Sequence, residues 1–361
     1  MLQLILHRVF GSGLPGPFGG LGARMLCAML TALLIAALGG WKLIPWLRRR
    51  KVGERTEKTP IEDARLRREI AAKSGTPTMG GLIIAAGLAG GCLLWGRMEN
   101  VHLWLALACF AGLAALGMLD DWMKLTDRGR AGRGLKVRHK LLVQGLLGAG
   151  LGVVYWLRVR SAGPAPMPAA LLRDWALMLG PAVILWTALI VATMSNAANV
   201  TDGLDGLAGG LTLAALLPLG LLAYGPWRET IAGSDPQVRE LALFCAALGG
   251  AVLGFLLHNV HPARVFMGDT GSLAIGGSIG LVAVLARAEL LLPLFALVFL
   301  AEFASSVLQV LWFKATGRRI LPIAPLHHIP QQHGVPEGRI VVGMLIVGWA
   351  AALLPLPFLI G

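Results

Sequence analysis

The chain consists of long apolar stretches separated by short polar segments. A helix needs roughly 17 to 25 apolar residues to cross the hydrocarbon core of a bilayer, and stretches near that length recur along the whole sequence. This pattern predicts an all-α polytopic membrane protein with ten transmembrane helices. The predicted helices lie at about residues 22–46, 79–97, 101–119, 139–157, 175–194, 207–224, 240–258, 272–287, 290–312 and 340–360. The segment 272–287 is the shortest of them.

The composition favours lipid over water as the main surroundings of the chain. Hydrophobic residues make up 56% of the sequence and charged residues 14%, whereas a soluble domain contains about 25% charged residues. We interpret residues 1–361 as one integral membrane domain, because no polar stretch is long enough to form a second, soluble one. The four cysteines lie inside apolar segments and form no Cys-x-x-Cys pair, which argues against a redox or zinc site.

Lys and Arg residues are concentrated in alternate loops. Residues 48–73 contain ten of them and residues 124–140 contain seven, whereas the even-numbered loops contain between one and three each. Because basic loops stay in the cytoplasm, the odd-numbered loops are predicted to face inward and both termini to lie on the extracytoplasmic side. The net charge of +13 is therefore a topology signal and a source of attraction for anions. A basic soluble domain that binds nucleic acid is excluded.

Five aspartates lie in three loops on the predicted cytoplasmic side, or at the helix ends beside them. They are Asp120, Asp121, Asp202, Asp205 and Asp269. Two adjacent carboxylates repel each other unless a cation lies near them, and Mg²⁺ is typically held by one or two carboxylates plus substrate phosphates. A solvated helix cap would explain any one of these aspartates, but hardly the whole set. We therefore expect an active-site cleft at the cytoplasmic face.

The motif at residues 195–210 combines these acids with amides and glycines. If it is helical, Asn199, Asp202 and Gly206 share one face. A polar strip that enters a transmembrane helix is costly unless it lines a water-filled cavity. Close packing of helices through small residues is the alternative. That alternative explains the glycines but leaves Asn199 and the aspartates unexplained.

The motif Gly-Asp-Thr-Gly-Ser at residues 268–272 precedes another apolar segment. Glycines and a hydroxyl at the opening of a helix suit an anion or a metal-bound phosphate, with Ser272 as a helix-start residue. A simple N-cap is the alternative reading.

Basic and histidine-containing motifs complete the predicted inner face. Lys73 and Thr78 precede the second segment and Lys140 begins the fourth, although membrane anchoring explains either lysine alone. His327 and His328 lie in the last inside loop. Adjacent histidines point apart, and no third ligand has the spacing of a zinc site. Hydrogen bonding to a polar substrate and a plain surface loop both remain open.

Together these motifs resemble the polyprenyl-phosphate N-acetylhexosamine-1-phosphate transferases. The resemblance runs from about Lys73 to Glu337, covers five cytoplasmic motifs in the order of the family and agrees with the ten-helix topology. Its most specific parts are Lys-Ser-Gly-Thr-Pro-Thr-Met-Gly-Gly at 73–81 and Asn-Val-Thr-Asp-Gly-Leu-Asp-Gly-Leu-Ala at 199–208. Within the family, the chain is most similar to the members that use UDP-N-acetylmuramoyl-pentapeptide.

The resemblance implies a Mg²⁺-dependent transfer of the sugar phosphate to undecaprenyl phosphate with release of UMP, by a homodimer in the bacterial cytoplasmic membrane. It implies that Asp120 and Asp121 are an essential catalytic pair, that Asp269 is catalytic, and that Asp269 and Asp202 bind the metal. Residues expected at substrate-contacting positions are Lys73, Thr78, Lys124, Lys140, Asn199, Asp202, Asp205, Asn259, Phe266, Gly268, Ser272, Gln309, His327 and His328.

The last inside loop departs from the family pattern of three consecutive histidines followed two residues later by a glutamate. This chain has Ile329 in place of the third histidine and Gln331 in place of the glutamate. The change affects how the loop meets the sugar or the peptide, and leaves the expected metal site untouched.

Two other functions compete with this interpretation. A sister enzyme of the same family would use UDP-N-acetylglucosamine. The string at 73–81 favours the muramoyl-pentapeptide substrate instead, but the altered loop that contains His327 and His328 weakens that preference. A secondary transporter would carry its polar groups near the membrane midplane in paired repeats. Here the polar groups gather at one surface, and no repeat is evident.

Overall fold

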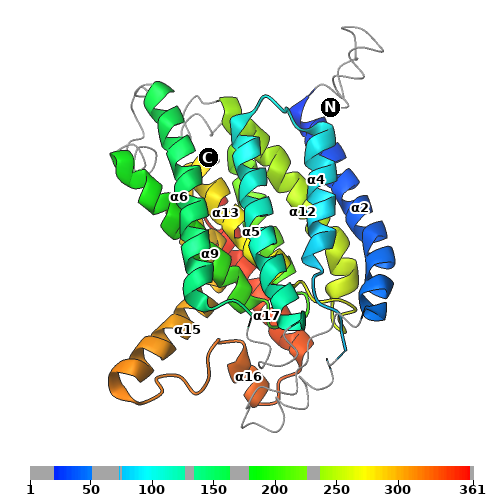
Figure 1. Cartoon of the computed structure of the whole chain (residues 1–361), viewed down its shortest axis with the longest axis vertical. Helices are drawn as coiled ribbons and strands as arrows, with labels where there is room; N and C mark the ends of the chain where they lie inside the picture. Colours follow the sequence, from blue (N-terminus) through cyan, green and yellow to red (C-terminus); the bar gives the residue numbers. More distant parts are fainter. Residues whose placement is uncertain are drawn as a thin grey trace.

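The computed structural model describes residues 20–50, 73, 75–126, 134–162, 179–225 and 236–357, and regular structure within them is helical. Figure 1 shows most of the helices side by side in one bundle, with α15 and α16 towards one end. The long helices are α2 (Leu21–Arg49), α4 (Gly81–Trp95), α5 (Val101–Thr126), α6 (Val137–Ala162), α9 (Val183–Thr201), α10 (Leu207–Tyr224), α12 (Arg239–Asn259), α13 (Gly268–Leu285), α15 (Leu297–Thr316) and α17 (Glu337–Leu353). The short ones are η2 (Gly180–Ala182), η3 (Pro236–Val238), η4 (Glu289–Leu291), α14 (Leu292–Phe295) and α16 (His328–Gln332).

The all-helical, polytopic membrane fold predicted from the apolar stretches is confirmed. Within the described residues, eight helices are long and apolar enough to cross a membrane. The two other helices that occupy predicted spans are shorter, since α4 has 15 residues and α17 has 17. Many of the Lys and Arg residues on which the predicted orientation rests, those within 51–72 and 127–133, lie outside the described residues.

Several helix boundaries differ from those expected. The helix predicted at 101–119 continues as α5 to Thr126, so Asp120 and Asp121 lie within a helix and not beyond its end. The predicted segment 272–287 begins four residues earlier, at Gly268. The predicted span 290–312 is divided at Ala296, whose φ of −123° separates α14 from α15.

Helix α13 forms the centre of the bundle and packs against α5 on one side and α9 on the other (Figure 1). In its apolar window, 94% of the residues are buried inside the protein. Glycines allow this close approach. A Cβ atom at Gly117 of α5 would lie 2.1 Å from the carbonyl oxygen of Asp269, and one at Gly276 of α13 would lie 2.2 Å from the carbonyl oxygen of Met194. Protein, and not lipid, therefore surrounds the shortest predicted segment.

Packing by small residues also explains part of the glycine-rich motif at 195–210. A Cβ atom at Gly209 would lie 2.7 Å from a methyl carbon of Leu256, and one at Gly210 would lie 2.5 Å from a methyl carbon of Leu345. These two glycines thus fit α10 against α12 and α17. The same explanation does not extend to Asn199, which makes polar contacts described below.

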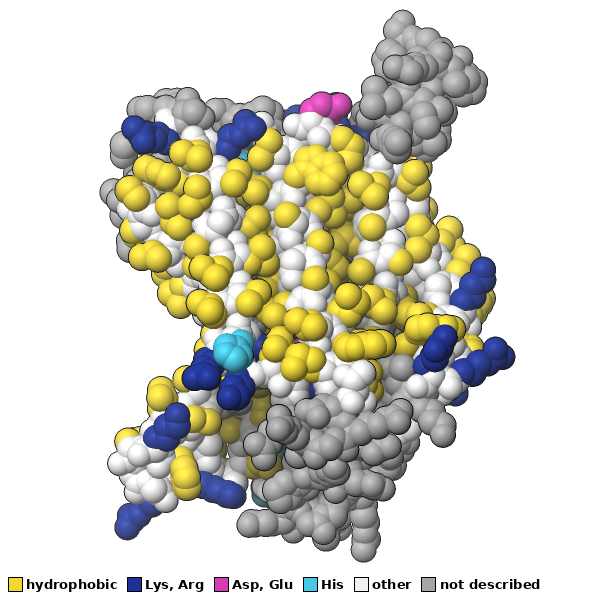
Figure 2. Space-filling view, viewed as in Figure 1, with side chains coloured by type: hydrophobic (Ala, Val, Ile, Leu, Met, Phe, Trp, Pro, Cys, Tyr) yellow, Lys and Arg dark blue, Asp and Glu magenta, His cyan; other side chains and the backbone are white. Residues whose placement is uncertain are grey.

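The outer surface has the character expected of a lipid-facing bundle. Figure 2 shows apolar side chains covering the middle of one face, with Lys and Arg towards its two ends. Helix α2 exposes an apolar stripe of Leu26, Leu30, Leu34 and Leu38 at four-residue spacing, and between 46% and 56% of each side chain is accessible. Exposed leucines in such a row are stable in hydrocarbon and unfavourable in water.

Because α5 and α13 are in close contact at Gly117, a single methyl group added there should lower the stability of the protein. In Gly117→Ala the new Cβ would clash with backbone at Asp269, so we expect the free energy of unfolding to fall by about 1–3 kcal/mol. Thermal unfolding in detergent measures it. The control is Gly145→Ala in α6, where a Cβ meets nothing within 4 Å, so helix propensity raises stability by up to about 1 kcal/mol. Equal stability of the two variants would contradict the packing described here.

Candidate active site

The ends of α5 and α13 bring three carboxylates together. The side chains of Asp120, Asp121 and Asp269 each offer an oxygen within 4.8 Å of the others, and all three residues are buried. We call this group the acidic cluster. Asp269 is separated from Asp120 and Asp121 by almost 150 positions in the sequence, and the packing of α5 against α13 makes them neighbours. Their assigned catalytic roles stay predictions.

Two lysines lie between the carboxylates of the acidic cluster. Lys124 Nζ is 2.8 Å from Asp120 Oδ2 and 3.1 Å from Asp269 Oδ1. Lys140 Nζ is 2.8 Å from Asp120 Oδ2 and 2.6 Å from Asp269 Oδ2. Lys124 lies one helical turn beyond Asp120 on α5, whereas Lys140 is in the first turn of α6. The three carboxylates and two ammonium groups together carry one net negative charge.

Asp121 holds the first turn of α13. Its carboxylate accepts hydrogen bonds from the backbone nitrogens of Asp269 and Thr270, at 3.2 and 3.0 Å, and from the Thr270 hydroxyl at 2.7 Å. A helix leaves its first backbone N–H groups without partners, and a carboxylate there also interacts favourably with the helix dipole. Asp121 therefore caps α13 from a neighbouring helix.

Ser272 is not the helix-start residue that the motif suggested. Helix α13 already begins at Gly268, and the Ser272 hydroxyl donates to the Gly268 carbonyl at 3.0 Å, inside the first turn. Asn199 of α9 reaches across and donates its side-chain N–H groups to Asp269 Oδ1 and to Ser272 Oγ, both at 2.9 Å. These contacts make Asn199 part of the surroundings of the acidic cluster.

The segment that contains Thr78 runs beside the start of α13. The backbone nitrogen of Phe266 donates to the Pro77 carbonyl at 2.8 Å, and Gly80 N donates to the Phe266 carbonyl at 2.8 Å. Gly268 has φ +71°, and a Cβ there would lie 2.6 Å from Thr78 Oγ1 and 2.7 Å from Asp121 Oδ2. Glycine is thus required at 268, because a side chain would displace Thr78 from the edge of the acidic cluster.

A second charged group joins distant parts of the chain. Lys73 Nζ lies 2.8 Å from Asp205 Oδ1 and 2.6 Å from Glu337 Oε1, and Glu337 Oε1 also accepts from the Asp205 backbone nitrogen at 2.7 Å. His261 Nδ1 lies 3.0 Å from Asp205 Oδ2. Burial acts to lower the pKa of Lys73, but hydrogen bonds to Asp205 and Glu337 outweigh it and raise the pKa above its ordinary value of 10.5. Lys73 is therefore a fixed positive charge.

Asn259 and Phe266 frame this second group. The Asn259 amide accepts from Gly206 N at 3.0 Å and donates to the Val265 carbonyl at 2.9 Å, which fixes the turn at Gly206, whose φ is +81°. The Lys73 ammonium lies 5.9 Å from the centre of the Phe266 ring, within the range of a cation–π interaction. An aromatic face beside a held lysine is suited to a planar, polar ligand group.

The loop that contains His327 and His328, here called the histidine loop, is held by a residue of α15. Glu302 is buried and accepts hydrogen bonds from the backbone nitrogen and from Nδ1 of His327, both at 3.1 Å. His327 Nε2 has no hydrogen-bond partner among the described residues, and a Cβ at Gly203 would lie 2.5 Å from it. The ring therefore projects onto the turn that follows Asp202.

His328 is held by the residue that departs from the family pattern. Its Nδ1 lies 2.7 Å from Oε1 of the buried Gln331. Burial lowers the pKa of His328 below its ordinary value of 6.5, and repulsion from His327 lowers it further. A neutral amide partner suits a neutral imidazole, so the ring donates through Nδ1 and can accept through Nε2.

Two predicted residues, Asp202 and Gln309, have other surroundings or are not part of a described ligand set. Asp202 follows the last turn of α9 and belongs to neither of the two ligand sets found among the described residues. Gln309 holds the chain after α15, since its side-chain oxygen accepts from the Ile320 and Leu321 nitrogens at 3.2 and 2.9 Å. Substrate and metal contacts of these two side chains stay predictions.

The sequence reasoning missed three residues that organise the site, namely His261, Glu302 and Glu337. An acid within an apolar segment is a signal in itself, because a charge at membrane depth is rare without a partner; Glu302 inside 290–312 meets that description. His261 and Glu337 lie inside quoted motifs, but no spacing rule connects them to Asp205.

The acidic cluster fits a divalent cation by its chemistry. Carboxylate oxygens are the ligands that Mg²⁺ prefers, and a carboxylate can accept more hydrogen bonds or metal contacts than the lysines use. The Asp269 side chain is the most accessible of the three, at 11% against 0% for Asp120 and 4% for Asp121. A cation would thus reach Asp269 first.

Comparisons with known proteins identify the family of the chain. Glycosyl transferase family 4 matches residues 103–287, and signature 1 of the phospho-N-acetylmuramoyl-pentapeptide transferases matches residues 73–84. The chain belongs to the phospho-N-acetylmuramoyl-pentapeptide transferase family. A relative of that name from Granulibacter bethesdensis is 40% identical over 91% of each chain. One from Phenylobacterium zucineum is 35% identical over 99% of this chain and 94% of its own, and one from Gemmatimonas aurantiaca is 40% identical over 92% of each.

The matched regions contain the whole acidic cluster and most of the second charged group. The match at 103–287 includes the whole acidic cluster, both lysines beside it and Asp205. The signature at 73–84 begins with Lys73 and includes Thr78. Glu302, Glu337 and the histidine loop lie beyond both matches, but within the region shared with the full-length relatives.

The capping contacts of Asp121 predict a structural as well as a chemical effect. Asp121→Ala would leave three donors at the start of a buried helix without their acceptor, so we expect the free energy of unfolding to fall by about 1–3 kcal/mol. Unfolding in detergent measures this. Thr270→Val is the matched control, because it removes one of the three bonds and should cost about a third as much. Loss of turnover at unchanged stability in Asp121→Ala would contradict the capping role.

The buried position of His328 beside Gln331 leads us to expect that the stability of the protein falls in acid. Because the folded pKa lies below the ordinary value, the unfolded chain takes up the proton first, and stability falls as pH drops through 6.5 towards the folded pKa. In Gln331→Glu the carboxylate would stabilise the imidazolium and raise that pKa, so the loss should diminish. Unfolding temperatures between about pH 8 and pH 5 provide the measurement. Gln332→Glu, one position along, is the control and should keep the original pH profile.

Proposed function

We propose that this protein transfers phospho-N-acetylmuramoyl-pentapeptide from its UDP-linked precursor to undecaprenyl phosphate, giving lipid I and UMP, the first membrane step of peptidoglycan synthesis. The single observation that carries the proposal is the acidic cluster with its two bridging lysines, contained in a chain whose full-length relatives bear the name of this transferase. Such a group is suited to phosphoryl transfer, where catalysis is mainly positioning and charge stabilisation.

The reaction has to overcome repulsion between two phosphates. The attacking phosphate monoester carries a charge of about −1.5 to −2 at pH 7, and the pyrophosphate of the donor is also negative. At roughly 4 Å and an effective dielectric constant near 20, each pair of unit charges costs about 4 kcal/mol. The total is on the order of 10 kcal/mol or more, which the positive groups of the site must offset.

Lys124 and Lys140 are the nearest described cations to the acidic cluster and would offset that repulsion. We infer that an arriving phosphate draws the two ammonium groups from the carboxylates onto its own oxygens. The freed carboxylates, Asp269 above all, would hold Mg²⁺. When bound, Mg²⁺ supplies Lewis-acid stabilisation of the charge that develops on the transferred phosphoryl group.

Direct attack by the polyprenyl phosphate is favoured over a covalent phospho-enzyme. With a second pKa of about 6, only about a tenth of the attacking phosphate keeps its proton at neutral pH, so a general base has little to remove. Asp269 is also engaged by Lys124, Lys140 and Asn199, which makes it a poor nucleophile in this arrangement. Trapping a stable aspartyl phosphate would overturn this preference.

The second charged group would bind the nucleotide. Lys73, the Phe266 ring and the turn held by Asn259 form a polar and aromatic surface suited to the uridine portion of the donor. His327 and His328 would contact the sugar or the peptide from the histidine loop. Asp202 and Gln309 are retained as proposed substrate contacts, and Asp202 as a proposed metal ligand.

The proposed setting is the bacterial cytoplasmic membrane, with the active site facing the cytoplasm. Ten spans, both termini on the extracytoplasmic side and a homodimeric assembly are part of the proposal. The distribution of Lys and Arg among the loops supports this orientation, and the position of the acidic cluster at the inner ends of α5 and α13 is compatible with it.

The deciding experiment is an assay of the purified protein with UDP-N-acetylmuramoyl-pentapeptide and undecaprenyl phosphate, with and without Mg²⁺. We expect UMP release that requires all three components. Equal or greater turnover of UDP-N-acetylglucosamine would assign the sister activity instead. Transport of a solute without any UMP release would assign a transporter.

Removing a charge from the acidic cluster or from the lysines beside it should reduce turnover far more than removing an exposed charge nearby. We expect Asp269→Asn and Lys140→Ala each to reduce kcat/KM by about 10²–10³-fold. Lys136→Ala is the matched control, because Lys136 is exposed four residues before Lys140 and should change turnover less than about twofold. Turnover near the wild-type level in either cluster variant would contradict the mechanism.

A further inference from the structure

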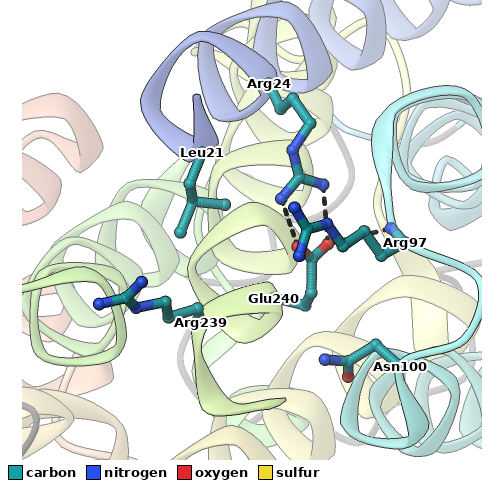
Figure 3. Close-up of a pocket in the computed structure, with 6 residues that line it drawn as sticks. All are labelled: Leu21, Arg24, Arg97, Asn100, Arg239 and Glu240. Atoms are coloured by element: carbon teal, nitrogen blue, oxygen red, sulfur yellow. Dashed lines mark hydrogen bonds and ion pairs between the residues drawn. The ribbon is translucent and has the colours of Figure 1, made fainter. Parts of the chain in front are cut away.

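A separate pocket lies at the opposite end of the bundle from the acidic cluster. It is lined by Leu21 and Arg24 of α2, Arg97 and Asn100 before α5, and Arg239 and Glu240 of α12 (Figure 3). Asn100 directly precedes α5, and Asp120 lies 20 residues further along the helix, so about 30 Å separates the two places. That distance is about the thickness of the hydrocarbon core.

The floor of the pocket is a buried ion pair. Arg24 and Glu240 are both buried and bonded to each other, and Arg24 Nη1 also donates to the Trp95 carbonyl at 3.0 Å. Glu240 Oε2 accepts in addition from the Arg97 backbone nitrogen at 3.1 Å. Glu240 thus has little capacity left for another cation. The Nε atom of Arg24, although buried, has no hydrogen-bond partner among the described residues.

The rim of the pocket carries two further positive charges. Arg97 and Arg239 are exposed, and within the described part of the chain no carboxylate forms an ion pair with either guanidinium. In Figure 3 the Arg97 side chain overlaps the buried pair, whereas the Arg239 side chain points away from it. Three arginines against one glutamate leave the lining with a charge of +2. This excess lies on the side of the molecule that has few basic residues, so orientation in the membrane does not account for it.

The size and surroundings of the pocket limit what it can bind. Its volume of about 220 Å³ is below the roughly 300–1,000 Å³ typical of sites for drug-sized ligands, so it suits a headgroup and not a nucleotide. Arginine forks match phosphate oxygens in geometry. Beside the pocket, the last turn of α4 exposes Leu93 and Leu94, and α2 exposes Leu26 and Leu30. An anion bound here can therefore keep an attached acyl chain against apolar surface.

We propose that this pocket binds the phosphate headgroup of an anionic lipid, with Arg97 and Arg239 as its charged contacts and the Arg24–Glu240 pair as its rigid floor. In the orientation proposed above, the lipid belongs to the extracytoplasmic leaflet. The site is separate from the transfer reaction and would anchor the outer ends of α2, α5 and α12 to the membrane surface.

The test uses the full-length protein in detergent, titrated with phosphatidylglycerol, with zwitterionic phosphatidylcholine or with inorganic phosphate. Lipid retained per protein is counted by native mass spectrometry. We expect selective retention of phosphatidylglycerol, and a fall in its apparent affinity of about fivefold to tenfold in Arg97→Gln and in Arg239→Gln. The matched control is Arg160→Gln. Arg160 is exposed near the end of α6, on the same side of the bundle as the pocket, and the variant should bind the lipid like the wild type.

The outcomes separate the possible sources of the anion. Displacement of phosphatidylglycerol by inorganic phosphate at equal concentration would overturn the lipid assignment in favour of a soluble anion. Unchanged retention in both arginine variants would overturn the site itself. UMP release, measured on the same samples, should stay within twofold of the wild type, because neither arginine lies near the acidic cluster. Absence of UMP release from the wild type would refute the proposed transfer and leave the lipid result standing.

Discussion

Two lysine ammonium groups lie among the buried carboxylates of Asp120, Asp121 and Asp269 and offset their mutual repulsion. Carboxylate oxygens within 4.8 Å of one another and shielded from water would repel each other strongly without these cations. Lys124 and Lys140 leave a single net negative charge, and they come from different helices. The charge balance therefore requires α5, α6 and α13 to meet at one level, and the rest of this end of the bundle is arranged around that meeting point.

The same three acids have different environments and hence different tasks. Asp121 is engaged by the first turn of α13, Asp120 by lysines and by the Leu135 nitrogen at 2.6 Å, and only Asp269 keeps a side chain accessible from outside. The glycine at 117 allows this division, because it brings α5 against the backbone of Asp269. Packing inside the bundle thus decides which carboxylate is available to a cation and which is structural.

The charged group around Lys73 extends the site. Among the described residues, no ion pair connects it to the acidic cluster. Lys73, Asp205 and Glu337 come from distant thirds of the chain, and the Lys73 ammonium forms an ion pair with each of the two carboxylates. From inside an apolar helix, Glu302 accepts hydrogen bonds from the backbone nitrogen and from Nδ1 of His327. Buried charges of this kind are stable only as pairs, so the loops that carry them are held in place by electrostatics as much as by apolar contact.

The sequence by itself determined the membrane environment, the helical spans and the set of polar motifs, because hydrophobic length and local composition are properties of neighbouring residues. It also identified the family, since the strings at 73–81 and 199–208 are contiguous. Only the tertiary structure decided that Asp121 caps α13, that Ser272 lies inside a helix and that Glu302, Glu337 and His261 belong to the site. Apart from the bond of Ser272 to Gly268, those assignments rest on contacts between residues 25 to 149 positions apart, and such contacts leave no local pattern from which they can be read.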